Sequence, residues 1–249
     1  MTMQFVSVFT DEDTTNMPDK GPSDIPSMDD IIVNWKGIHK LIMNLNVHKS
    51  AGPDNISPFI LRTAATQIAP ALAKLFQLSL KTGVVPQDWR EASVVPLFKK
   101  GDKHQPANYR PVSLTSITCK LLEHVVHSNI MKHFDKHNIL KDNQHGFRKR
   151  RSCETQLLTT VHELLSNIAQ KNQVDIILLD FAKAFDKVPH RRLLHKLDYY
   201  GVRGQTNTWI QSFLETSRLS WMGQNLLQPT FCLACPKELY LVPYSSWRT

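Results

Sequence analysis

Apolar residues in the first third of the chain recur at helical spacing. One set predicts a helix that ends before the loop 49–55. The set consists of Ile38, Leu41, Ile42 and Leu45. Ser57 followed by Pro58 is typical of a helix start, since the hydroxyl caps free N–H groups and proline needs no donor there. We expect this helix to reach about Gln67. A further helix stops at Gly83 and carries on one face Leu72, Leu75, Phe76 and Leu80.

The middle of the chain combines strand and helix patterns. Residues 92–100 and 111–116 are predicted strands, and the polar, turn-rich loop between them predicts a hairpin. Ser116 can cap a long helix whose apolar face holds Leu121, Leu122, Val125, Ile130 and Phe134. The next helix has an apolar face made of Leu157, Val161, Leu164, Leu165 and Ile168.

The run VDIILLDF, residues 174–181, is short, apolar and rich in β-branched side chains. This composition predicts a strand buried on both faces. Helices are expected at 193–200 and 209–214, with Gly201 between them. Together these elements predict an α+β fold with many helices.

Charge is distributed unevenly. Residues 1–30 carry seven acidic side chains and one basic one, and with three prolines they predict an unfolded or loosely attached acidic arm. Residues 99–151 carry twelve Lys or Arg against four Asp or Glu, a net charge of +8. Such density suits a phosphate backbone, because each neutralised phosphate releases counterions. A solvated helix face would have the same composition.

Composition narrows the class of protein. With 41% hydrophobic and 21% charged residues the chain is of ordinary globular type. No apolar run is long enough to cross a membrane, and the first residues lack the basic start of a secretory signal. Four unevenly spaced cysteines do not indicate a disulfide scaffold. We therefore expect an intracellular protein, nuclear or cytoplasmic, without membrane contact.

Asp180 is the first candidate for chemistry, because it ends the predicted buried strand. A buried carboxylate needs a cation or hydrogen-bond donors. Mg²⁺ prefers one or two protein carboxylates together with substrate phosphate oxygens, so Asp180 suits phosphoryl or nucleotidyl transfer. The alternatives are an aspartate that caps the following turn, and a phosphatase nucleophile, although Ala182 stands where such sites commonly have a second aspartate.

Five sequence blocks occur in an order that is specific to one family. LLDFAKAFDKVPH (178–190) closely resembles the first catalytic motif of reverse transcriptases from LINE-type, or non-LTR, retrotransposons. The other blocks are KSAGPDNI (49–56), VVPLFKKGDK (94–103), NYRPVSL (108–114) and QHGFRKRRSC (144–153). The resemblance extends over about residues 4–214, and it implies the fingers and part of the palm of a right-hand polymerase.

The resemblance implies roles for individual residues. Asp180 would be a catalytic carboxylate that binds metal, helped by the carbonyl of Phe181, and Phe185 would lie beside the sugar of the incoming nucleotide unless it only packs in the core. Lys99 (or Lys100) and Arg110 would grip the triphosphate. Template or primer phosphates would be bound by Lys49, Arg148, Lys149, Arg150 and Arg151; a nuclear-localisation signal is the alternative for the last four. Mg²⁺, deoxynucleoside triphosphates, an RNA template and a DNA primer are the implied partners, and the oligomeric state is left open.

Other features are expected to be structural. Asp186 should stabilise a helix start. Cys232 and Cys235 form a CxxC pair that no second pair or histidine follows, so a zinc site is not expected. The histidines at 124, 127, 133 and 137 have helical ligand spacing, but they lack a glutamate in an HExxH pattern and should be solvated.

The likeness fails towards the end of the chain. Family members continue with a glycine-proline-glutamine motif and then a pair of adjacent aspartates, and neither follows residue 214. Residues 215–249 show no helical or strand periodicity. One choice of codons for 234–249, shifted by one base, spells GVPQGTVLGPLLFLAY, a good version of the missing motif, so we expect this tail to be out of frame.

The sequence thus predicts an acidic arm (1–30), a fingers-like region (31–172), a partial palm (173–214) and a tail that does not belong to the family (215–249). Negligible polymerase activity is expected, because one carboxylate cannot hold two metals. Loss of later palm strands should also leave the 174–181 edge exposed and prone to aggregation. A basic RNA-binding module without catalysis and a helical interaction protein are the alternative functions.

Overall fold

The computed structural model describes residue 17, residues 19–181, 184 and 187–215, and the backbone of residues 218–221 and 224–225. Its helices are α2 (Trp35–Met43), α3 (Pro58–Thr63), α4 (Ala65–Thr82), α5 (Ile117–Lys136), α6 (Cys153–Ala169), α7 (His190–Tyr199) and α8 (Gly204–Glu215). The strands are β1 (Glu91–Phe98), β2 (Tyr109–Thr115), β3 (Arg218–Trp221) and β4 (Gln224–Asn225), and the 3₁₀ turns are η1 (Gln87–Trp89) and η2 (Pro106–Asn108). This mixture agrees with the predicted α+β class. No helix among the described residues is long and apolar enough to cross a membrane.

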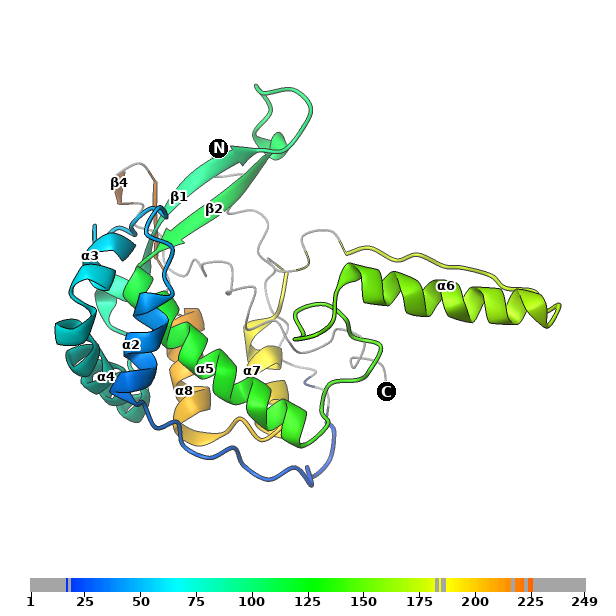
Figure 1. The fold of residues 1–249 in the computed structure, drawn as a ribbon, viewed down its shortest axis with the longest axis horizontal. Helices are drawn as coiled ribbons and strands as arrows, with labels where there is room; N and C mark the ends of the chain where they lie inside the picture. Colours follow the sequence, from blue (N-terminus) through cyan, green and yellow to red (C-terminus); the bar gives the residue numbers. More distant parts are fainter. Residues whose placement is uncertain are drawn as a thin grey trace.

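Helices α2, α4, α5, α7 and α8 form a body around one hydrophobic core (Figure 1). Its largest fully buried side chains include Trp209, Phe76 and Phe134. The indole nitrogen of Trp209 donates to the hydroxyl of Ser79 at 2.9 Å, so its polar atom is satisfied inside the core.

The local signals for helix ends are largely confirmed. The Ser57 hydroxyl accepts from the N–H of Ile60, and Gly83 ends α4 in the left-handed conformation at φ 67°. The expected continuation from Pro58 to about Gln67 is wrong, because Ala64 leaves helical geometry and separates α3 from α4. Spacing could not show this break, since the apolar period continues through both helices.

The predicted hairpin is confirmed. Strands β1 and β2 pair antiparallel from Ala92 opposite Thr115 to Phe98 opposite Tyr109. The hairpin projects away from the helical body (Figure 1). Strand β3 adds to the body end of β1 in parallel, giving the order β2-β1-β3-β4. Strands β3 and β4 lie in the segment 215–249, where the sequence pattern indicated no strand.

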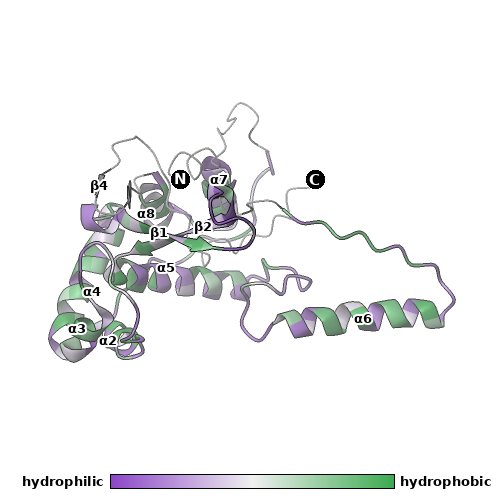
Figure 2. Ribbon diagram, turned by 90° about the horizontal axis from the view of Figure 1, so that it is seen from above, coloured by the Kyte–Doolittle hydropathy of each residue, from purple (hydrophilic) through white to green (hydrophobic). Residues whose placement is uncertain are grey.

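Helix α6 stands apart from the body (Figures 1 and 2). Its start is well formed, because Ser152 and Thr155 make a reciprocal capping box. None of its residues is buried, although its amphipathic pattern is the one expected from the sequence. The apolar face of α6 is therefore largely exposed, as Leu157, Leu165 and Ile168 show.

The strand predicted for residues 174–181 is wrong. This segment is irregular (Figure 2). Leu178 within it is 91% exposed. A strand buried on both faces needs hydrogen-bonded neighbours and covering layers, and the described part of the chain offers this segment neither. Its apolar side chains are exposed, although not as the edge of a strand.

The described part of the acidic arm lies against the corner between α7 and α8. The N–H of Met28 donates to the carbonyl of Gly201 at 2.8 Å, and the Lys20 ammonium lies 5.4 Å from the ring centre of Tyr199. The second half of the arm is therefore attached. Phe185, Asp186, Cys232 and Cys235 lie outside the described residues, as do residues 1–16.

Candidate nucleic-acid interface

The loop at the end of the β1–β2 hairpin is braced by its own polar groups. The N–H of Lys99 donates to the carbonyl of Asn108 at 2.8 Å, and the Asn108 side-chain amide donates to the carbonyl of Asp102 at 2.8 Å. Gly101 has φ 89°, a conformation that glycine adopts without strain. These contacts hold the basic loop in one shape before any ligand arrives.

The hairpin register decides which lysine accompanies Arg110. Arg110 lies opposite Leu97, and side chains alternate between the two faces of a strand. Lys99, whose N–H still bonds across the hairpin, therefore shares the face of Arg110. Lys100 lies past the paired strands, in the bend of the loop. Lys99 and Arg110 form a diagonal pair, a spacing of about 7–8 Å between Cα atoms. Both side chains are exposed, so this face offers two cations to a polyanion.

The opposite face of the hairpin end carries two aromatic rings that the sequence analysis did not single out. Phe98 and Tyr109 lie opposite each other in the register, with ring centres 5.5 Å apart and planes at 62°. The Lys103 ammonium lies 5.7 Å from the centre of the Phe98 ring. Strand alternation combined with the hairpin register was the signal that could have found this pair.

The block around Lys49 lies at the base of the hairpin. A Cβ atom on Gly52 would lie 2.6 Å from the Thr115 carbonyl oxygen and 2.7 Å from the Ser116 nitrogen, so only glycine fits there. This close approach fixes residues 49–56 against the junction of β2 and α5. Lys49 itself is exposed.

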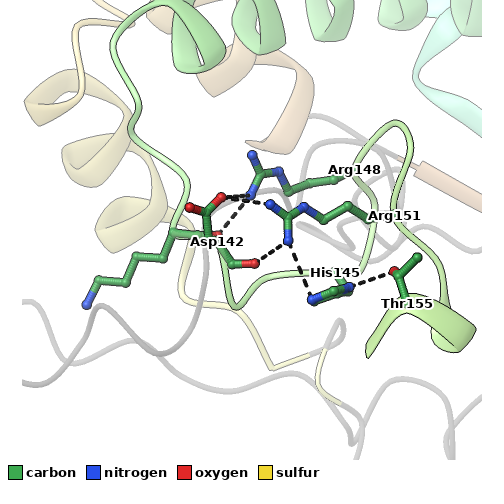
Figure 3. A network of polar contacts seen from close by, with 6 residues as sticks. Asp142, His145, Arg148, Arg151 and Thr155 are labelled. Atoms are coloured by element: carbon green, nitrogen blue, oxygen red, sulfur yellow. Dashed lines mark hydrogen bonds and ion pairs between the residues drawn. The ribbon is translucent and has the colours of Figure 1, made fainter. Parts of the chain in front are cut away.

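The basic loop before α6 is held together by Asp142 (Figure 3). Arg151 donates from Nη1 to the Asp142 carbonyl at 2.6 Å and from Nη2 to its Oδ1 at 2.7 Å. Arg148 donates to the carbonyl of Lys141 at 2.9 Å and lies 4.0 Å from Asp142 Oδ1. His145 links the loop to α6, because its Nδ1 lies 2.8 Å from the Thr155 hydroxyl.

The four consecutive basic residues at 148–151 thus divide into two pairs. Arg148 and Arg151 are half-buried and bonded within the loop, whereas Lys149 and Arg150 are exposed. Arg150 has φ 61°, one of the few left-handed non-glycine positions described. The loop presents the second pair to solvent and uses the first pair to keep its shape.

Asp180 lies in the exposed, irregular segment, and not at the end of a buried strand as expected. Phe181 is exposed beside it. Among the residues that the structure describes, no group of three His, Cys, Asp or Glu side chains could hold a metal ion. One carboxylate does not fit a two-metal site, which needs several acidic ligands around two metal ions that lie about 3.5–4 Å from each other. No catalytic step follows from this arrangement.

The buried titratable groups lie in the helical body. Lys196 of α7 is almost fully buried, and desolvation, with a smaller contribution from Lys20, lowers its pKa to about 8. Burial also lowers the pKa of His133, whose Nε2 lies 2.8 Å from the Tyr200 carbonyl, so this histidine is not solvated as expected. Burial raises the pKa of the Cys119 thiol, which donates to Glu123 at 3.3 Å.

Comparison with known proteins places the hairpin end and the basic loop within one family match. A family described as "Reverse transcriptase (RNA-dependent DNA polymerase)" matches residues 98–234. The match continues twenty residues beyond 214, where we expected the likeness to end. It stops at Ala234, the first residue of the stretch that spells the missing motif in the shifted frame.

Individual relatives come from mobile elements. The chain is 29% identical over 188 residues to "Probable RNA-directed DNA polymerase from transposon BS" of Drosophila melanogaster, covering 73% of this chain and 20% of that protein. It is 28% identical over 165 residues to the RNA-directed DNA polymerase from mobile element jockey of the same species, covering 66% and 18%. A Pol polyprotein from retrotransposable element R2 of Popillia japonica is 27% identical over 141 residues, covering 57% and 19%. The chain thus spans about a fifth of the length of the curated relatives it matches.

Proposed function

The chain belongs to the reverse transcriptase (RNA-dependent DNA polymerase) family, and from that premise we propose that it binds RNA and nucleotide phosphates but does not synthesise DNA by itself. It is a reverse transcriptase domain fragment of the non-LTR retrotransposon type. The observation that carries the binding proposal is the braced hairpin end, which presents Lys99 and Arg110 on one face.

The Lys99 and Arg110 pair is proposed to hold the triphosphate of a deoxynucleotide. Two exposed cations on one face of a rigid loop attract a polyanion, and the planar guanidinium can donate two parallel hydrogen bonds to phosphate oxygens. Lys100 lies past the end of the paired strands and provides a matched control of the same charge. Lys99→Gln should weaken binding of a fluorescent deoxynucleoside triphosphate severalfold, and Lys100→Gln should leave it nearly unchanged.

The backbone of RNA is proposed to meet the exposed cations Lys149 and Arg150, together with Lys49. Each phosphate that they neutralise releases counterions, so affinity should fall linearly with the logarithm of salt concentration. Template RNA and primer DNA are the partners that this proposal implies for the complete domain.

Asp180 and the Phe181 carbonyl are proposed to hold Mg²⁺ only in a complete palm. The chain contains no aspartate after Asp198, so the adjacent aspartates of the family motif are missing from it. Out-of-frame translation within the tail 215–249 is the proposed cause, and the end of the family match at Ala234, where the shifted reading begins, supports it. Sequencing the transcript tests this cause, because codons that cannot spell the motif one base earlier would exclude it.

Salt-dependent RNA binding and primer extension together test the function. Fluorescence anisotropy with a labelled RNA should give an affinity that falls with salt, both for the wild-type chain and for Asp180→Ala. Extension of a DNA primer on an RNA template, with Mg²⁺ and deoxynucleoside triphosphates, should be undetectable. Extension by the wild-type chain would contradict the proposed inactivity. An RNA affinity that does not change with salt concentration, or no RNA binding at all, would instead favour the alternative function of a helical interaction protein.

A further inference from the structure

We propose that Phe98 and Tyr109 form a ledge on which an unpaired base of single-stranded RNA stacks, with Lys103 beside it to meet the phosphate. This inference rests on the proposed RNA binding and adds the form of RNA and the residues that recognise it. It concerns the face of the hairpin opposite Lys99 and Arg110.

The geometry of the ledge is fixed before binding. The phenol hydroxyl of Tyr109 donates to the Lys103 carbonyl at 2.9 Å, which ties the ring to the braced loop. Phe98 meets Tyr109 edge to face across the strand pair. Because neighbouring atoms already hold both rings, little side-chain freedom is lost when a base stacks on them.

Exposure indicates that the ledge has room for a ligand. Phe98 is 37% exposed, and β1 ends there, at the end of the hairpin away from the helical body (Figure 1). A phenylalanine that served core packing would face the body, as the buried Ala92 and Val94 do at the other end of the same strand face. The ring thus lies where a base could reach it.

Charge favours nucleic acid over an apolar partner. Lys100 and Lys103 lie close to the ledge in sequence, and the only acidic residue between positions 99 and 110 is Asp102. The Asp102 carboxylate accepts from the N–H of His104 at 2.9 Å and so helps to shape the loop. Aromatic rings interleaved with cations are the usual surface for a single strand.

Stacking also selects single strands over duplexes. In a duplex both faces of each internal base are covered by neighbouring bases, whereas an unpaired base offers its face to an aromatic side chain. The ledge should therefore contribute to binding of a single-stranded RNA and contribute little to binding of a blunt duplex.

The test compares two substitutions on the same strand. Phe98→Ala removes the ledge, and Leu97→Ala is its matched control, because Leu97 is 59% exposed and points to the opposite face. Anisotropy is measured with a labelled single-stranded RNA and with a blunt RNA duplex over a range of salt concentrations. Circular dichroism checks that each variant folds.

Phe98→Ala should weaken single-strand binding about fivefold or more, from the usual contribution of one stacked base. Its salt dependence and its duplex affinity should match the wild type. Lys103→Gln should reduce the salt slope by about 0.7, the value for one phosphate of a single strand. Phe98→Trp should keep the affinity and show fluorescence quenching on binding.

Two failures can be told apart. If the wild-type chain binds neither RNA, the proposed function fails. If it binds RNA and Phe98→Ala binds the single strand as tightly as Leu97→Ala, the ledge is overturned while RNA binding stands. A loss by Phe98→Ala that is equal for the duplex would also overturn it, because the internal bases of a duplex offer no free face.

Discussion

Arg151 holds Asp142 by two hydrogen bonds, one to its carbonyl at 2.6 Å and one to its carboxylate at 2.7 Å. The aspartate side chain is otherwise largely exposed. The neighbouring Arg150 is exposed to solvent. Arg151 therefore holds the loop together, whereas Arg150 is available to bind RNA, and substitutions can distinguish these two roles.

Arg151→Gln should loosen the loop and lower the free energy of unfolding by about 0.5–1 kcal/mol, since exposed ion pairs contribute little. Arg150→Gln should leave that free energy unchanged and reduce the salt slope of RNA binding by about 0.7–0.9, the value for one phosphate contact. Urea unfolding and anisotropy measure the two effects. Equal effects of both substitutions on RNA binding and on stability would contradict this division.

Substitutions of Gly52 and Gly37 by alanine should change the free energy of unfolding in opposite directions. A Cβ on Gly52 would collide with the backbone at Thr115 and Ser116, whereas Gly37 in α2 has nothing within 4 Å of an added Cβ. Gly52→Ala should lower the free energy of unfolding by about 1–3 kcal/mol through overpacking. Gly37→Ala should raise it by about 0.5–1 kcal/mol, because alanine favours a helix more than glycine does.

Chemical denaturation of the two variants measures this difference. The Gly52 variant should also bind RNA more weakly if the base of the hairpin shifts. A Gly52→Ala protein as stable as the wild type would mean that residues 49–56 are not packed against the hairpin.

The sequence predicted the elements whose signals are local. Ser57 and Ser116 cap helices through bonds to residues only three positions away, and Gly83 ends α4 through its own backbone conformation. The hairpin was predictable for a similar reason, since its strands are close in sequence. These features depend on few distant contacts.

The site depends on contacts that spacing does not show. Arg148 and Arg151 differ from Lys149 and Arg150 because of contacts with Asp142, which lies nine residues before Arg151. Phe98 and Tyr109 meet because the hairpin register places them opposite each other. The strand expected at 174–181 failed because a buried strand needs neighbours that its own composition cannot supply. The composition of residues 174–181 correctly indicated an apolar segment, but it could not show whether neighbouring strands are present to pair with it.

The buried Lys196 should make stability depend on pH at alkaline values. Its pKa is lowered to about 8 in the folded chain, against about 10.4 for an ordinary lysine, so the unfolded chain binds more protons between these values. Stability should therefore rise as pH increases from about 8 to 10.4, by about 3 kcal/mol at most. Below pH 8 both states are protonated, and this contribution stays constant.

Lys196→Met is the variant that isolates this effect. Urea unfolding at several pH values should show a difference between wild type and variant that changes in favour of the wild type as pH rises through this range. Lys20→Gln should leave most of the rise in place, because desolvation is the larger cause of the shift. A constant difference between wild type and Lys196→Met would show that Lys196 does not titrate there.

The exposed apolar segment predicts self-association that one charge can reduce. Leu178 and Leu179 are almost fully exposed, so replacing either with glutamate removes no buried contact. Leu178→Glu should leave the free energy of unfolding within about 0.5 kcal/mol of the wild type and lower the tendency to aggregate. By contrast, Leu197→Ala in the core should cost about 2–5 kcal/mol, because Leu197 is fully buried in α7. Light scattering at increasing concentration, beside urea unfolding, measures both quantities. If Leu178→Glu destabilised the chain as much as Leu197→Ala does, residues 174–181 would be packed in solution, and the missing neighbours would not explain the lost strand.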